Sequence, residues 1–291
     1  MTRAERIANL IGVVVPFLGL IAAVVLLWQS WVDWIDLGIL AGLYLLFGAG
    51  ITVGYHRLLT HRAFQTHKPV EYGFAVVGSM ALQGGVLDWV ADHRKHHAHT
   101  DQEGDPHSPH VGHGEGLSGL WHAHTGWLLT HHGTAASRQY AKDLREDPGM
   151  RLINRRFPLI VLAGLALPAL AGWAITGTLA GAATGFLWGG LVRVFLVHHV
   201  TWSVNSVCHF LGSRRFETDD ESRNVFWLAL PSFGESWHHN HHAFPRSAEH
   251  GLRRWELDPS ALVIRGLEKV GLARNVVRIA PERQRQRQAS A

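Results

Sequence analysis

Charged side chains are scarce in this sequence. Asp, Glu, Lys and Arg make up 17% of its 291 residues, whereas a soluble domain usually carries about 25%. Long apolar runs account for the deficit, since 47% of the residues are hydrophobic, and this combination indicates a membrane protein. The length would allow one or two domains, but the apolar runs alternate with histidine clusters. We therefore expect a single domain over residues 1–291.

Cysteine is nearly absent, because Cys208 is the only one. An intrachain disulfide and a cysteine-based zinc site are therefore excluded. The net charge of +4 and the isoelectric point near 9.6 do not predict nucleic-acid binding. The basic residues flank the apolar runs, where they are expected to face anionic lipid.

Four apolar runs are long enough to cross a bilayer as helices. The predicted spans are residues 7–28, 37–53, 157–175 and 181–202. The first run lacks a convincing small-x-small cleavage site, so we interpret it as a retained span. Residues 70–90 are also apolar but contain Glu71, Gln83 and Asp88. Because this segment joins two histidine clusters, we expect one helix that lies along, or dips into, the membrane interface.

Lys and Arg are missing from both short linkers between paired spans. Of the 27 basic residues, 2 precede the first span, 11 lie between the second and third, 13 follow the fourth and Arg193 lies within it. The positive-inside rule therefore predicts cytoplasmic termini, with segments 54–156 and 212–280 also cytoplasmic. We expect the cell (inner) membrane as the location. The Arg- and Gln-rich tail, residues 281–291, is expected to be disordered.

Histidine, by contrast, is abundant, with 22 residues. Two segments share the spacing H-x-x-H-H: His93, His96 and His97, and His238, His241 and His242. On a helix these positions share one face. Such imidazoles are poor core residues, because each needs partners for both ring nitrogens, but they are good ligands for Fe, Zn, Cu or Ni.

A further cluster contains His56 and His61, and His209 closes the fourth span. Residues five apart lie about 140° apart on an ideal helix, so we expect the helix to end or bend between His56 and His61. Asn205 lies one turn before His209 and could hold a metal-bound water. Nine candidate histidines are too many for one metal, so they imply either two metals or a list that contains residues other than ligands.

No carboxylate recurs inside the clusters, which argues against a Glu-x-x-His di-iron bundle. Asp92, Asp105 and Glu235 lie close in sequence and are expected to accept hydrogen bonds from the imidazoles. A structural zinc would need only four ligands. An open, all-histidine, two-metal site beside a membrane suits iron and dioxygen acting on a lipid chain.

Four motifs together resemble the histidine boxes of the integral-membrane fatty-acid desaturases, over about residues 37–277: H-R-L-L-T-H, D-H-R-K-H-H, N-S-V-C-H-F-L-G and G-E-S-W-H-H-N-H-H-A-F-P. They are most similar to the acyl-CoA (stearoyl-CoA type) Δ9 branch. The resemblance implies an all-α polytopic enzyme with four transmembrane helices and a cytoplasmic helical cap holding a di-iron site. It also implies O2-dependent desaturation of a long-chain acyl-CoA to a cis Δ9 product.

The resemblance also assigns residues. It implies that two iron ions are held by the nine histidines, which are also the catalytic residues, with Asn205 acting through water: His56, His61, His93, His96, His97, His209, His238, His241 and His242. Gln83, Trp89 and Thr201 match positions that bend the acyl tunnel, and Tyr44 and Gly48 match its closed end. Without the resemblance, we would interpret these five residues as ordinary helix-packing residues.

The sequence differs from the motifs of the animal desaturases at three positions that affect the expected metal ligands and the acyl carrier. His239 stands where animal enzymes have Asn, so we leave it outside the ligand set. Ala91 and Gly84 differ in the region that holds the CoA headgroup, which leaves acyl-carrier protein and phospholipid open as carriers. The resemblance is to a bacterial form without a cytochrome b5 domain, so electrons are expected from a separate partner. This partner would be a ferredoxin, a rubredoxin or a cytochrome with its reductase.

The remaining histidines are expected in loops, behind the ligands or near headgroups: His67, His99, His107, His110, His113, His122, His124, His131, His132 and His250. Two alternatives stay open. The nearer is a fatty-acyl or alkyl hydroxylase or decarboxylase on the same metal framework. The farther is a non-redox metal-binding or metal-transporting membrane protein, which would place polar ligands at mid-membrane, whereas here they cluster outside the predicted spans.

Overall fold

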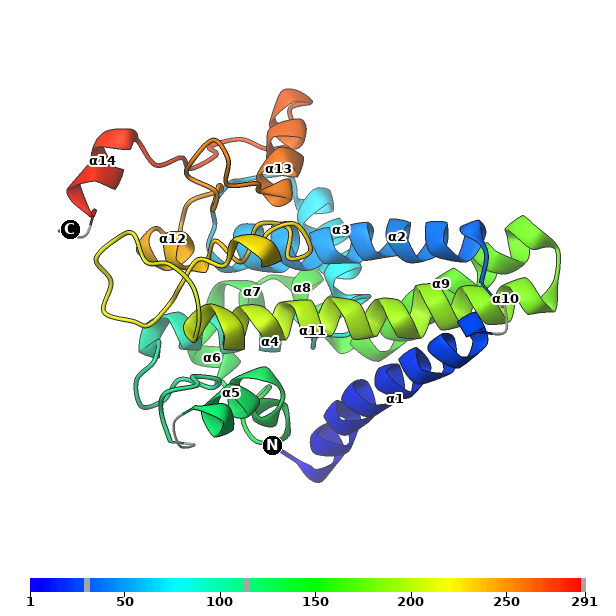
Figure 1. The fold of residues 1–291 in the computed structure, drawn as a ribbon. Helices are drawn as coiled ribbons and strands as arrows, with labels where there is room; N and C mark the ends of the chain where they lie inside the picture. Colours follow the sequence, from blue (N-terminus) through cyan, green and yellow to red (C-terminus); the bar gives the residue numbers. More distant parts are fainter. Residues whose placement is uncertain (29–31, 113–115, 289–291) are drawn as a thin grey trace.

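The structure is a computed structural model that describes residues 1–28, 32–112 and 116–288. Across these ranges the regular structure is helical, and the only β structure is a set of isolated bridges. The expected all-α architecture is confirmed (Figure 1). His113 and the last three residues of the tail lie outside the described residues.

Four helices are long and apolar enough to cross a membrane, as the four apolar runs predict. The first and third are α1 (Arg3–Trp28) and α9 (Phe157–Thr176). The second is α2 (Trp34–Ala49) with its π-helical continuation Gly50–Thr60. The fourth combines α10 (Leu179–Gly185), the π-helical segment Phe186–Val192, α11 (Arg193–Ser206) and a 3-10 turn at Val207–His209.

The second and fourth helices extend well past the expected ends at residues 53 and 202. They stay helical because their final turns are buried against the rest of the chain instead of ending in water. His56 and His209 therefore lie on the spanning helices themselves.

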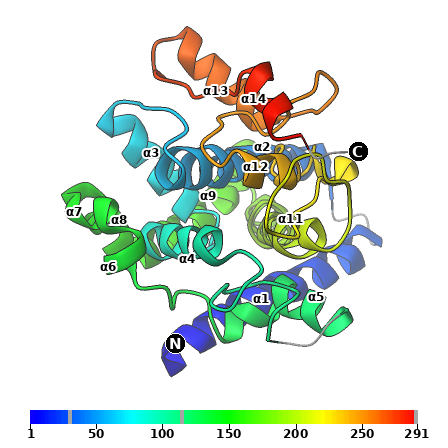
Figure 2. The ribbon, with the colours of Figure 1, turned by 90° about the vertical axis from the view of Figure 1, so that its left-hand side faces the viewer.

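The turn between α9 and α10 and the start of α2 lie at one end of the four-helix unit, and α4, α12 and α14 lie toward the other (Figure 1). In the perpendicular view, α1 and α2 lie on opposite sides of α11, and the cap helices surround its end (Figure 2). Every histidine cluster is thus at the end opposite the α9–α10 turn.

Residues 70–90 do not form the single interfacial helix that we expected. They form α3 (Lys68–Ser79) and the start of α4 (Val86–His99), separated by a turn. The turn contains Leu82 at φ 61° and Gly84 at φ 105°. Left-handed backbone of this kind cannot continue a right-handed helix, which explains the break.

Shorter helices complete the cap that covers the histidine end: α5 (Leu117–His124), α6 (Ser137–Tyr140), α7 (Lys142–Glu146), α8 (Pro148–Arg155), α12 (His238–Ala243) and α13 (Pro259–Lys269). The largest cluster of buried apolar side chains joins the π-helical end of α2 to α4, α7 and α8, and includes Tyr55, Leu58, Val90, Leu144 and Met150. The spanning helices and the cap therefore share one core.

The tail is not disordered from residue 281, as we had expected. Residues Pro281–Gln286 form α14, and the backbone carbonyl of Arg287 accepts a hydrogen bond from the Glu217 N–H. The Arg287 guanidinium also donates to the carbonyl of Ala243. These contacts attach the tail to the end of α12 and to the segment that precedes α12.

Candidate metal centre

Five histidines form one group at the histidine end of the bundle. Their ligand-type nitrogens all lie within 4.8 Å of one another: His56, His61, His93, His97 and His241. The Nε2 atom of His241 lies 3.2 Å from that of His56 and 2.9 Å from that of His97. Nitrogens bound about 2.1 Å from a common metal at right angles are about 3.0 Å apart, so these separations fit one coordination sphere.

Four further histidines form a second, fully buried group: His96, His209, His238 and His242. The Nε2 atoms of His209 and His238 lie 2.9 Å apart, and those of His96 and His242 lie 3.4 Å apart. The nine histidines expected from the sequence are thus all brought together, as two sets. Nine candidates had left two possibilities, two metals or an incorrect list, and the two all-histidine groups favour two metals.

The H-x-x-H-H spacing explains how each helix serves both groups. On α4, the i and i+4 residues His93 and His97 join the five-histidine group, and His96 at i+3 joins the other. On α12 the assignment is reversed, since His238 and His242 join the four-histidine group and His241 joins the first. Neighbouring histidines on one helix face point a few ångströms apart, which places the two groups side by side.

His56 and His61 come together through a widened helix rather than through the end or bend that we had expected. They lie at the end of the π-helical segment Gly50–Thr60, and the His61 N–H donates to the His56 carbonyl, five residues earlier. This i→i+5 bond is the π-helical pattern. It brings the two imidazole centroids to 4.8 Å.

Carboxylates bind the outer nitrogens of several of these imidazoles. His96 Nδ1 lies 3.0 Å from both carboxylate oxygens of Asp105, and His56 Nδ1 is hydrogen-bonded to Glu235, both as expected. Sequence reasoning missed two more carboxylates, Asp101 at 2.9 Å from His209 Nδ1 and Asp220 at 2.9 Å from His242 Nδ1. A carboxylate on Nδ1 leaves Nε2 free to accept a metal.

Glu235 belongs to a buried ionic network that the sequence did not reveal. Its Oε1 accepts from the Arg57 guanidinium at 2.8 Å, and Arg57 also lies 3.0 Å from Asp258. Burial opposes ionisation of Glu235, but Arg57 and His56 overcome it and lower the pKa of Glu235. The network therefore holds a charged carboxylate behind His56.

Asp92 does not have the role that we expected. Its carboxylate accepts from the backbone N–H of Gly133 at 2.6 Å and of Ala135 at 3.2 Å, and it lies 3.3 Å from His132 Nδ1. None of these partners belongs to the two histidine groups. Asp92 lies one turn before His96 on α4, and its side chain anchors the loop near residue 133.

Four imidazoles of the five-histidine group favour the neutral state that binds metals. Burial, followed by the neighbouring imidazoles, holds the pKa of His61, His93, His97 and His241 well below the ordinary value. His61 Nε2 is buried and has no hydrogen-bond partner within the described residues. A bound metal would satisfy this atom, so the residues fit a pair of metal ions.

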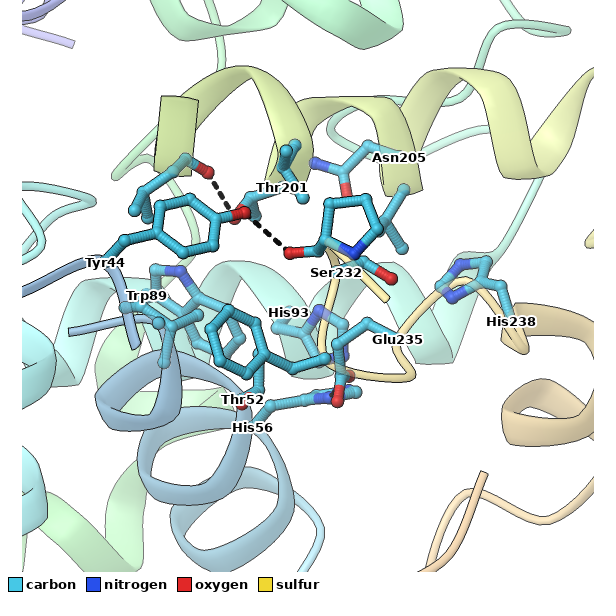
Figure 3. Close-up of a pocket in the computed structure, with 17 residues that line it drawn as sticks. Tyr44, Thr52, His56, Trp89, His93, Thr201, Asn205, Ser232, Glu235 and His238 are labelled. Atoms are coloured by element: carbon cyan, nitrogen blue, oxygen red, sulfur yellow. Dashed lines mark hydrogen bonds and ion pairs between the residues drawn. The ribbon is translucent and has the colours of Figure 1, made fainter. Parts of the chain in front are cut away.

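A narrow cavity of about 50 Å³ adjoins the groups, with an apolar lining. Tyr44, Gly48, Trp89 and Thr201, four of the five expected tunnel residues, line it. Figure 3 shows Trp89, His93, Asn205 and His238 around the same space. Within this lining the Tyr44 ring stacks on Phe233, with centroids 5.6 Å apart, and the Tyr44 hydroxyl donates to the Pro231 carbonyl at 2.6 Å.

A second cavity of about 610 Å³ shares Trp89, His93, Thr201 and Asn205 with the first. Gln83, the fifth expected tunnel residue, lines this one. Its amide donates to Thr201 Oγ1 at 2.9 Å and accepts from Trp89 Nε1 at 3.4 Å. The three residues expected at the bend thus form one hydrogen-bonded group where the cavities meet.

Of the other histidines, three have positions that bear on the site. His107 is buried beside His96, with ring centroids 4.3 Å apart, and forms a group with His96 and Asp105. His239 lies outside both groups, with Nε2 accepting from the Phe216 N–H at 2.9 Å. His250 is buried beside His241, with ring centroids 4.5 Å apart, and its Nδ1 lies 3.6 Å from Glu235. Nothing in the spacing around His250 indicated this position.

Comparison with known proteins identifies the family to which this arrangement belongs. The fatty acid desaturase family matches residues 29–267, which contain both histidine groups and most of both cavities. The chain is therefore a member of the fatty acid desaturase family and an oxidoreductase of lipid metabolism.

Three relatives show how the family varies. The chain is 44% identical over 268 residues to a hex-5-enoyl-[acyl-carrier protein] acetylenase of Moorena producens, covering 90% of this chain and 83% of the relative. It is 41% identical over 264 residues to an sn-1 stearoyl-lipid 9-desaturase of Anabaena variabilis, covering 89% and 91%. It is 39% identical over 268 residues to an icosanoyl-CoA 5-desaturase of Limnanthes douglasii, covering 89% and 68%.

Proposed function

We propose that this protein introduces a cis double bond, at Δ9, into a long-chain fatty acyl group, consuming dioxygen and two electrons supplied by a separate donor. The observation that carries the proposal is the pair of all-imidazole groups beside an apolar cavity. The name of the Anabaena relative supports the Δ9 position. In this reaction two C–H bonds of the chain are broken, and dioxygen is reduced to two waters with two electrons and two protons from outside.

Iron ions held by the two groups would supply the activation of dioxygen and the removal of hydrogen. The chain's own residues determine which methylene is presented. The apolar wall of the first cavity excludes water, and the group of Gln83, Trp89 and Thr201 sets the path of the acyl chain. Asn205 lines both cavities and could hold a water for the four-histidine group.

The resemblance of the motifs favours acyl-CoA as the carrier, but the names of the relatives also include a lipid and an acyl-carrier protein. We place the protein in the inner membrane, with the histidine end on the cytoplasmic side. The basic residues are concentrated on the segments at this end, where a ferredoxin, a rubredoxin or a cytochrome with its reductase can reach the centre.

The test is fatty-acid analysis of cells that express the protein together with an electron donor. Gas chromatography–mass spectrometry with double-bond derivatisation should detect a new Δ9 monoene. His97→Ala should abolish the product and lower bound iron, because His97 Nε2 lies 2.9 Å from His241 Nε2.

The matched control is His99→Ala, on the same helix but outside both groups, which should keep product and metal. A hydroxy acid or a terminal alkene in place of the monoene would overturn the assigned reaction. A triple bond would extend it toward the acetylenase relative. Unchanged product in His97→Ala would refute the ligand assignment.

A further inference from the structure

The second cavity reaches the outer surface of the membrane-spanning helices. Starting at Gln83, Trp89 and Thr201, its wall continues along the first half of α1, with Ile11 and Gly12, and along α9, with Leu162 and Leu165. Ile11 is 56% exposed and Leu162 is 61% exposed, so residues of the cavity wall also form the outer surface. The cavity therefore opens sideways, between α1 and α9.

This opening lies within the hydrocarbon layer rather than in water. Ile11 is eight residues into α1 and Leu165 is eight residues into α9, which at 1.5 Å per residue is about 12 Å along each helix. Figure 1 shows α1 inclined away from the other spanning helices. A chain entering here would leave lipid and meet an apolar wall without crossing water.

Cationic side chains stand where these two helices begin. Arg3 and Arg6 lie in the first turn of α1, and Arg155 and Arg156 immediately precede α9. All four are exposed, and no ion pair joins any of them to a carboxylate of the described residues. Guanidinium groups bind phosphate well, and at this level of a membrane the available phosphate is that of a phospholipid headgroup.

We propose that the substrate is a phospholipid-linked acyl chain, which enters sideways between α1 and α9 with its phosphate at these four arginines. The chain then runs through the second cavity and past Gln83, Trp89 and Thr201 to the metal centre. This inference rests on the proposed desaturation. The phosphates of CoA share the same chemistry, but a CoA-linked chain arriving from water has no need of an opening on the lipid side.

Gly12→Trp tests the route. A Cβ atom at Gly12 would meet no atom within 4 Å, so the indole can occupy the cavity without displacing the fold. Gly38→Trp is the matched control, since Gly38 on α2 has equal space but does not line either cavity. Thermal unfolding and iron content should match wild type in both variants.

The first readout is binding, which does not depend on turnover. Nanodiscs would contain phosphatidylglycerol with a diazirine on the acyl chain, and crosslinks would be mapped by mass spectrometry. We expect crosslinks in residues 82–89 and 197–205, lowered at least tenfold by Gly12→Trp and unchanged by Gly38→Trp. Equal crosslinking in both variants would overturn the route.

The second readout is desaturation of stearoyl phosphatidylglycerol, of the same chain on a digalactosyl lipid without phosphate, and of stearoyl-CoA. Arg155→Gln with Arg156→Gln should raise KM several-fold for phosphatidylglycerol but not for the galactolipid, whereas Arg138→Gln should not. If the wild-type protein desaturated stearoyl-CoA but neither lipid, this inference would be overturned, whereas the proposed desaturation would still hold. No desaturation with any carrier would overturn the proposed function itself.

Discussion

The carboxylates behind the imidazoles decide which nitrogen of each ring faces the metal. Asp220 accepts from His242 Nδ1 at 2.9 Å and thereby directs Nε2 into the four-histidine group. We expect Asp220→Ala to weaken metal binding and turnover by about 10–100-fold, the usual cost of losing such a partner. Iron retention during a chelator titration, with turnover beside it, measures the effect.

Asp219→Ala is the control for this prediction, because the neighbouring Asp219 is exposed and outside the group. It should retain metal like wild type. If both variants retained metal equally, Asp220 would have no orienting role.

A second prediction concerns Gly48, which lines the first cavity and which the resemblance to the desaturases assigns to its closed end. A Cβ atom there would come within 2.4 Å of the Phe233 ring, so the ring must shift into the space that the acyl chain would use. Gly48→Ala should therefore move the product distribution toward shorter chains, as measured by gas chromatography–mass spectrometry. Gly42→Ala, with open space around it, should leave the distribution unchanged. Longer or unchanged products from Gly48→Ala would contradict the placement of the closed end.

Individual site residues were predictable from the sequence where they form a pattern over a few neighbouring positions. The nine histidines stand in short repeated spacings, and a helix converts such spacing into a shared face. Asp101 and Asp220 were not predictable, because Asp101 reaches His209, more than one hundred residues later, and Asp220 acts from an irregular loop. The role of Asp92 was predicted wrongly because closeness in sequence was taken for contact in space. Asp92 adjoins His93 in sequence, but its carboxylate accepts a hydrogen bond from the loop near Gly133.

Helix α8 begins at an N-terminal cap that the side chain of Asp147 provides. Asp147 accepts from the N–H groups of Gly149 and Met150 and from Lys68 Nζ at 2.7 Å. Burial opposes ionisation, but Lys68 and the Met150 N–H lower the pKa of Asp147 to about 2. Because the folded value lies below the unfolded value of about 3.9, this stabilisation is complete above pH about 4 and is lost as the pH falls toward 2.

Asp147→Ala should therefore lower the free energy of unfolding at pH 7 by about 1 kcal/mol, the usual value of an N-cap. Thermal unfolding in detergent at pH 6, 4 and 2.5 should show the difference from wild type shrinking. Glu146→Ala, which removes only an exposed pair with Lys142 at 3.9 Å, should change little. A difference that grew at acid pH would reverse the assigned sign.

The elements were predictable where hydropathy alone determines them. Four apolar runs gave four spanning helices, because backbone in a bilayer must satisfy its hydrogen bonds internally. The division of residues 70–90 into α3 and α4 was not predictable, since it depends on the backbone of Leu82, a residue type that seldom adopts positive φ. The π-helical segment was also missed, although the five-residue spacing of His56 and His61 is its signature in this chain.

The whole molecule combines two environments that meet at the metal centre. Helices with lipid-facing surfaces carry His56 and His209 to one end, where α4 and α12 supply the remaining histidines. The same junction brings the cavity between α1 and α9 to the first cavity. In the proposed reaction, an acyl chain that enters from lipid and electrons that arrive from the cytoplasmic side would therefore meet at the metal centre without either crossing the membrane.

The last prediction concerns the orientation of the whole molecule in its membrane. Segments 54–156 and 212–280 carry 21 of the 27 basic residues, and the α9–α10 turn carries none, so the histidine end should face the cytoplasm. Cys208 is buried, which makes the chain suitable for mapping with single introduced cysteines. Ala180→Cys, near the turn, should react with a membrane-impermeant maleimide in intact cells, and Gln139→Cys, between α4 and α9, only after lysis. The opposite pattern would place the centre outside and separate it from any cytoplasmic donor.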